Sequence, residues 1–220
     1  MMKNHFSKEL SALLNRLNVQ GTRVAEATEG AFSAFARKDA DAARTIIDCD
    51  KFIDREEICI EEECLKLLAL YQPVAIDLRT LVSILKINTS LERMADFAAH
   101  MAERAIDISA RACPPQEDIF DFAPMHKVVQ SMLHDTLTVI CRSDMDVAYR
   151  VIEQDNTVDT MRTEHRNHVR QALARCPMHA DYLMDCHGLA RDLERIADLC
   201  TDICEHIIYL RTASIVRHSF

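Results

Sequence analysis

Apolar residues recur at intervals close to 3.6 along most of the chain, which is typical of amphipathic helices. The prolines fall in three short stretches, YQPVAIDLR, CPPQEDIFDFAP and RCPMHAD. Because proline interrupts a helix, these stretches mark joints between long elements. The pattern predicts an all-α fold with helices over 5–36, 39–70, 74–111, 124–142, 144–175 and 179–212.

The second half of the chain repeats the first. FARKDADAARTII (35–47) matches ICRSDMDVAYRVI (140–152) at an offset of 105 residues, and this offset also pairs Asp50 with Asp155 and Asp54 with Asp159. LERMADFAAHMAERAI and LERIADLCTDICEHII match at an offset of 102. We therefore expect two tandem three-helix bundles, six long antiparallel helices in all. The expected segments are a first repeat over 1–112, a linker over 113–123 and a second repeat over 124–220.

Composition narrows the function classes. The chain has 220 residues, 49% of them hydrophobic, with only 3 Gly and 5 Pro, which favours a few long elements over a turn-rich sheet. Its net charge of -9 argues against general binding to nucleic acid. No apolar run approaches the ~20 residues of a membrane span, so membrane insertion is not expected. The N-terminus lacks an apolar signal core, which favours a cytoplasmic location with free thiols. Cys200 and Cys204 are expected in the core.

Acidic side chains continue the apolar stripes of four predicted helices. In the third helix the stripe begins with Leu78, Leu81 and Leu85 and then becomes acidic, and the sixth helix does the same. The second and fifth helices carry two aspartates each beside their stripes. The residues predicted to form these acidic faces are Asp50, Asp54, Glu92, Asp96, Asp155, Asp159, Glu194 and Asp198.

Acids four residues apart share a helical face and repel each other, and partial burial raises that cost unless a cation compensates. Few basic residues are apparent at the facing positions. Pairs of carboxylates on neighbouring helices suit hard cations such as Fe(III), Mn, Mg or Ca, with Zn also open. The alternative is a solvated acidic face. Further candidate ligands are His100, Glu103, Asp202 and Glu205, whereas Glu57, Glu61, Glu62 and Glu63 are expected to be surface charge.

These segments resemble a known family. The stretches 72–105 and 193–210 are similar to the two signature segments of the PhoU family of bacterial phosphate-uptake regulators. DCDKFID (48–54) and EQDNTVD (153–159) resemble its other acidic motif. The resemblance implies multinuclear clusters of iron or zinc on the eight acids named above, with manganese or magnesium as alternatives. The chain departs from the family pattern at two pairs of positions, with Ala95 and Ala197 in place of Gly, and His100 and Asp202 in place of Asn.

The resemblance also implies a non-enzymatic regulator on the cytoplasmic side of the inner membrane. Its implied partners are the ATPase subunit of a Pst-type phosphate ABC transporter, a PhoR-type histidine kinase and a second copy of the chain. One competing function is a carboxylate-bridged di-metal oxidase, but that class uses Glu-x-x-His twice and this sequence contains none. Another is a metal-free structural bundle that docks to a partner.

Overall fold

The computed structural model describes residues 2–212 and confirms the all-α fold. Its helices are α1 (Met2–Arg37), α2 (Ala40–Tyr71), α3 (Ala75–Ser109), α4 (Ala123–Arg142), α5 (Met145–Arg175) and α6 (Ala180–Thr212). Two short 3₁₀ turns, η1 (Gln116–Asp118) and η2 (Pro177–His179), precede α4 and α6. No strand occurs within residues 2–212. The outermost residues of the two expected repeats, 1 and 213–220, lie outside the described part.

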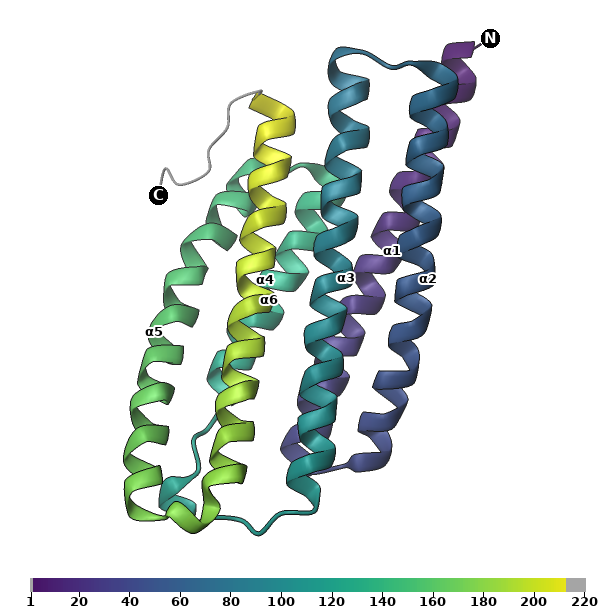
Figure 1. The fold of residues 1–220 in the computed structure, drawn as a ribbon. Helices are drawn as coiled ribbons and strands as arrows, with labels where there is room; N and C mark the ends of the chain where they lie inside the picture. Colours follow the sequence, from purple (N-terminus) through teal and green to yellow (C-terminus); the bar gives the residue numbers. More distant parts are fainter. Residues whose placement is uncertain (1, 213–220) are drawn as a thin grey trace.

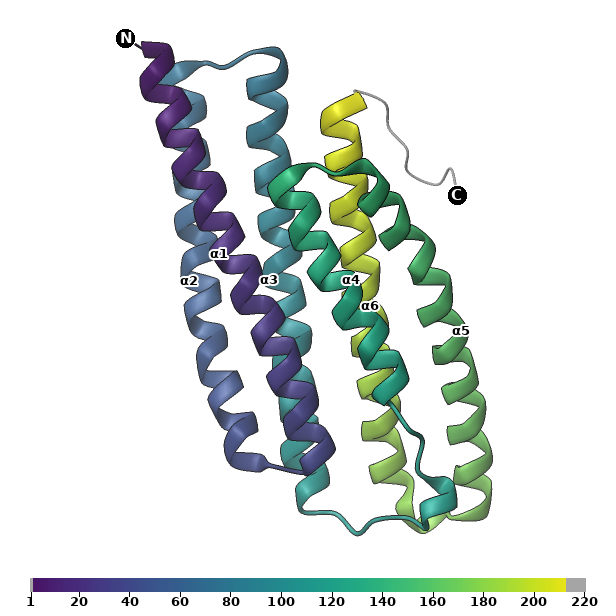
Figure 2. The ribbon, with the colours of Figure 1, turned by 180° about the vertical axis from the view of Figure 1, so that it is seen from behind.

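The helices form two layers. Helices α5, α6, α3 and α2 lie side by side in one layer, and α4 and α1 pack behind them (Figure 1). The view from behind shows α1 and α4 in front of that layer (Figure 2). Each repeat therefore contributes one pair of adjacent helices to the first layer, α2 with α3 and α5 with α6, and these are the helices that carry the repeated acids.

The same capping signal starts the second helix of each repeat. The Asp39 carboxylate accepts hydrogen bonds from the backbone N–H groups of Asp41 and Ala42, at 3.1 and 3.0 Å. Asp144 accepts one from the N–H of Val147 at 3.2 Å. These bonds satisfy donors that have no partner inside the helix, so the repeated Asp fixes where α2 and α5 begin.

The two repeats share one hydrophobic core. One large cluster of buried apolar side chains runs through all six helices, and it includes Cys200 and Cys204 as the sequence predicted. A smaller cluster of Val169, Ala172 and Leu183 lies between α5 and α6. The central contact is between α3 and α6, where the Nε of Arg104 donates to the buried carboxylate of Asp192 at 2.9 Å. Gly188 leaves space for that guanidinium, because a Cβ at Gly188 would lie 2.2 Å from the Arg104 Cζ.

The connection between the repeats spans residues 110–122 and is tied to the second repeat. Asp118 is buried, and its carboxylate accepts a hydrogen bond from the Nε of Arg175 at 2.9 Å. The division into domains at 113–123 stays a prediction. Across residues 2–212, each helix falls short of the length or the apolar character needed to cross a membrane.

Candidate metal centre

Three of the predicted acids converge in the first repeat. One carboxylate oxygen each from Asp50, Asp54 and Asp96 lie within 4.8 Å of one another. Asp50 and Asp54 are one turn apart on α2, and Asp96 faces them from α3. The site arises because the two acidic stripes meet along the seam between these helices. We call this group, together with Glu92 one turn before Asp96, the α2/α3 site.

Burial and mutual repulsion make the charged forms of these acids unfavourable. Burial, and then the charges of Asp54 and Asp96, raise the pKa of Asp50 to about 6. Burial, followed by the charges of Asp96 and Glu57, raises the pKa of Glu92 to about 7. The pKa of Asp96 is also raised, first by burial and then by Asp54. A bound cation would offset both effects, because its positive charge stabilises the ionised carboxylates and lowers their pKa.

The residues of the α2/α3 site fit a metal ion. Within the described chain, none of its four carboxylates forms an ion pair with a lysine or arginine. The Oδ1 atom of Asp50 is buried without a hydrogen-bond partner, which is a costly state for a carboxylate oxygen. An all-oxygen donor set of this kind suits hard cations, with water completing the coordination.

Three further residues near this site, His100, Glu103 and Glu57, lie in different surroundings. His100, one turn after Asp96, lies close enough to Asp50 and Asp96 for its positive charge to lower the pKa of both. Glu103 is exposed and is not among the converging carboxylates. Glu57 was expected to be surface charge, and the structure leaves it only partly exposed. It is half-buried beside Glu92, because its turn of α2 packs on α3.

The second repeat brings the matching acids together on α5 and α6. Burial, followed by the charges of Asp198, Asp159 and Glu194, raises the pKa of Asp155 to about 7. Asp202 adds to this effect, and the Oδ1 atom of Asp155 is buried without a hydrogen-bond partner. We call this group the α5/α6 site. A hollow of ≈ 490 Å³ adjoins it, lined by Asp155, Glu205 and their neighbours.

The α5/α6 site contains Arg162, which the sequence did not predict. The Nε atom of Arg162 on α5 lies 2.6 Å from Glu194 Oε2. The Nη1 atom of Arg195 lies 3.4 Å from Asp198 Oδ2. Basic residues are therefore scarce in the first seam but not in the second. The repeat alignment contained a signal for this difference, because the offset of 105 sets Arg162 against Glu57.

His187 lies on α6 two turns before Glu194 and packs beside another histidine. Its ring stacks near that of His165 on α5, with centroids 5.9 Å apart. His165 is fully buried, and neither of its ring nitrogens has a hydrogen-bond partner. Burial, followed by the charges of His187 and His168, lowers the pKa of His165 to about 4. His187 thus belongs to an aromatic cluster with the buried His165.

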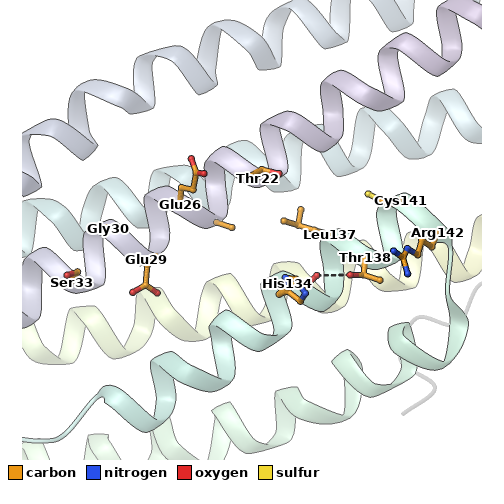
Figure 3. Close-up of a pocket in the computed structure, with 11 residues that line it drawn as sticks. Thr22, Glu26, Glu29, Gly30, Ser33, His134, Leu137, Thr138, Cys141 and Arg142 are labelled. Atoms are coloured by element: carbon orange, nitrogen blue, oxygen red, sulfur yellow. Dashed lines mark hydrogen bonds between the residues drawn. The ribbon is translucent and has the colours of Figure 1, made fainter.

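Another hollow, of ≈ 810 Å³, lies between α1 and α4. In Figure 3, Glu29 on α1 and His134 and Arg142 on α4 border this space, whereas the Glu26 side chain points away from α4. None of the eight repeated acids lines it. This hollow is therefore not part of the candidate metal centre, which consists of the α2/α3 site and the α5/α6 site.

Comparisons with known proteins agree with this architecture. The family model described as PhoU domain matches residues 18–105 and 122–207, once in each repeat. The chain is 34% identical to a phosphate-specific transport system accessory protein PhoU homolog of Aquifex aeolicus, over 96% of this chain and 95% of that protein. It is 30% identical to the phosphate-specific transport system accessory protein PhoU of Escherichia coli, over 99% and 89%.

Solved structures show the same arrangement of helices. PhoU from Pseudomonas aeruginosa superposes with a TM-score of 0.91 at 30% identity, covering 95% of this chain and all of that one. The phosphate transport system regulatory protein PhoU from Streptococcus pneumoniae gives 0.83 at 28% identity, covering 96% and 99%. Sequence, repeat structure and fold thus lead to one conclusion, that the chain is a member of the PhoU family.

Proposed function

We propose that this chain is a metal-binding, non-enzymatic regulator of phosphate uptake and of phosphate-starvation signalling. The observation that carries the proposal is the convergence of the Asp50, Asp54 and Asp96 carboxylates, none of which forms an ion pair with a lysine or arginine in the described part of the chain. Relatives named as phosphate transport accessory proteins support the regulatory part. A resident hard cation would supply positive charge and fix the two helices of a seam relative to each other.

The proposed action is binding and release of partners. In this proposal the chain docks as a homodimer, from the cytoplasm, on the ATPase subunit of a Pst-type phosphate transporter and on a PhoR-type kinase. Metal in the seams would replace a strongly acidic surface by one whose charge is largely neutralised. Since charge complementarity governs the rate and specificity of protein association, metal loading would change which partner surfaces can dock.

Complementation tests this function. The chain is expressed in a bacterium that lacks its own PhoU, and phosphate uptake and the starvation response are measured in phosphate-rich medium. We expect the parent chain to restrain both, and the triple variant Asp50→Ala, Asp54→Ala, Asp96→Ala to restrain neither. Asp48→Ala is the matched control, because Asp48 lies on the same helix but is exposed and paired with Lys51 at 2.8 Å.

Two results would count against the proposal. Failure of the parent to restrain uptake, in cells that contain the folded chain, would remove the phosphate function. Full activity of the triple variant would leave a regulator that needs no metal, which is the docking-bundle alternative. Oxygen consumption by an iron-loaded sample would instead support the oxidase alternative.

A further inference from the structure

The two seams differ in charge at equivalent positions. At the offset of 105 residues, Glu57 and Glu61 on α2 correspond to Arg162 and Arg166 on α5. The acids two turns and one turn earlier, Asp50 and Asp54, keep their identity in the second repeat. The divergence therefore begins one turn beyond the shared aspartates, at the position that faces the glutamate of the opposite helix.

Arg162 forms an ion pair with a carboxylate of the α5/α6 site. Its Nε atom lies 2.6 Å from Glu194, in a setting where the arginine side chain is 28% exposed and the glutamate 14%. The Nε–H has no hydrogen-bond partner, so the contact is an ion pair without hydrogen-bond geometry. Such a guanidinium neutralises the carboxylate and can still be displaced from it.

Arg195 does not explain the difference between the seams. It pairs with Asp198 at 3.4 Å, but the first repeat has Arg93 at the equivalent position. The charge of Arg93 also lowers the pKa of Asp96. The seams differ in charge at two pairs of positions. At 57 against 162, the first repeat adds a negative charge beside Glu92 and the second adds a positive charge that is ion-paired with Glu194. At 100 against 202, the first repeat has a histidine and the second an aspartate, so this pair acts in the opposite direction but blocks no carboxylate with an ion pair.

We propose that the two repeats bind metal unequally, with Arg162 acting as a built-in counter-ion of the α5/α6 site. The inference rests on the proposed metal binding and concerns hard divalent cations with oxygen ligands. A cation entering the α2/α3 site meets carboxylates that no arginine or lysine has paired. A cation entering the α5/α6 site must first displace Arg162 from Glu194. The first site therefore fills at lower metal concentration, and the second acts as a weaker site that responds to abundance.

Mn²⁺ titration followed by electron paramagnetic resonance tests this inference. Mn²⁺ is chosen because it prefers oxygen ligands, so the free cysteines, which would bind zinc, do not interfere. Asp198→Ala leaves only the first site, and Asp96→Ala leaves only the second. We expect the dissociation constant of the second site to exceed that of the first by on the order of tenfold or more, as one nearby unit charge produces in a partly buried site.

Charge exchange between the repeats provides the decisive comparison. In the Asp96→Ala background, Arg162→Glu should tighten Mn²⁺ binding by about tenfold or more. Arg166→Glu is the matched control, because it changes net charge equally on the same helix and lies one turn away at an exposed position. In the Asp198→Ala background, Glu57→Arg should weaken binding by a similar factor. Helicity and unfolding midpoints confirm that each variant is folded.

The outcomes separate this inference from the function on which it rests. Equal affinities at the two sites, or equal effects of Arg162→Glu and Arg166→Glu, would overturn the unequal loading while leaving metal binding intact. Absence of Mn²⁺ binding in the folded parent and in both single-site variants would overturn the metal proposal itself, and this inference with it.

Discussion

At the scale of single residues, the proposed metal ion would compete with protons for the same oxygens of the α2/α3 site. The pKa of Glu92 is raised to about 7 and that of Asp50 to about 6 in the metal-free protein. Metal binding must therefore release protons at and below neutral pH. We expect the Mn²⁺ affinity of the Asp198→Ala variant to be constant above about pH 8 and to fall steadily as pH is lowered through 7 and 6. Titrations between pH 5.5 and 8.5 measure this, and a flat profile would contradict it.

The buried imidazole of His165 lowers the stability of the second repeat. The equivalent residue in the first repeat is Ile60, which is fully buried in the same core. His165 leaves both ring nitrogens without partners, so His165→Ile removes a desolvation cost and fills a site that already suits isoleucine. We expect the free energy of unfolding at pH 7.5 to rise by about 1–2 kcal/mol, as measured by urea denaturation. A decrease would show that the histidine has a partner that compensates its burial.

The increase in the free energy of unfolding caused by His165→Ile should become larger as pH falls. The folded-state pKa of His165 is about 4, below its ordinary value of 6.5, so the unfolded chain takes up this proton first. The parent therefore loses stability as pH drops through 6.5, and the loss is complete only below about 4. At pH 5 the linkage adds about 2 kcal/mol to the difference between parent and variant. A difference that is independent of pH would mean that the imidazole has the same pKa in the folded and the unfolded chain.

The ion pair of Arg162 with Glu194 was the part of the site that the sequence did not predict. The positions of Asp50, Asp54 and Asp96 followed from helical periodicity, because residues four apart must share a face. Arg162 lies outside any motif, and periodicity on one helix does not say which residue it meets on another. Its contact with Glu194 depends on how α5 is rotated against α6, which packing determines.

At the scale of helices, the boundaries were predictable because local signals mark them. Asp39 and Asp144 cap α2 and α5, and Pro73 and Pro177 lie in the short connections to α3 and α6. The observed helix ends differ from the expected ones by three residues or fewer. The pairing of α3 with α6 had no such signal. It rests on a glycine and a buried ion pair whose partners are 88 residues apart.

That contact makes Gly188 intolerant of a larger side chain. A methyl group there would overlap the Arg104 guanidinium and move it away from Asp192, which is fully buried. Because a buried carboxylate without its partner is costly, we expect Gly188→Ala to destabilise the fold by about 2–4 kcal/mol in urea denaturation. Gly30→Ala is the control, since its methyl group would meet only the movable end of Ile46.

A second substitution separates the charge effect from simple crowding. Asp192→Asn removes the buried charge, so Gly188→Ala should cost much less in that background. If Gly188→Ala lowers the free energy of unfolding equally in the parent and in the Asp192→Asn background, steric overlap with Arg104 alone explains the loss. In that case the ion pair would have no special part in joining the repeats.

At the scale of the whole molecule, we expect the two repeats to behave as one folding unit. One large apolar cluster includes side chains of both repeats, and α3 of the first repeat packs along α6 of the second. A fragment of residues 1–112 would expose the face of α3 that α6 covers. We expect this fragment alone to lose much of its helicity or to aggregate, and to recover its helicity when mixed with residues 113–220. Circular dichroism of each fragment and of the mixture tests this, and a stable, fully helical single fragment would contradict it.

The central claim is that the repeated acids hold metal, and elemental analysis tests it most directly. The protein is purified without added metal or affinity tag and compared with the variant that carries Glu92→Ala, Asp96→Ala, Glu194→Ala and Asp198→Ala. We predict iron or zinc bound to the parent in multiple equivalents and lost from the variant, while helicity is retained. Absence of metal from both, with no change in melting temperature when iron, zinc, manganese or magnesium is added, would contradict the claim.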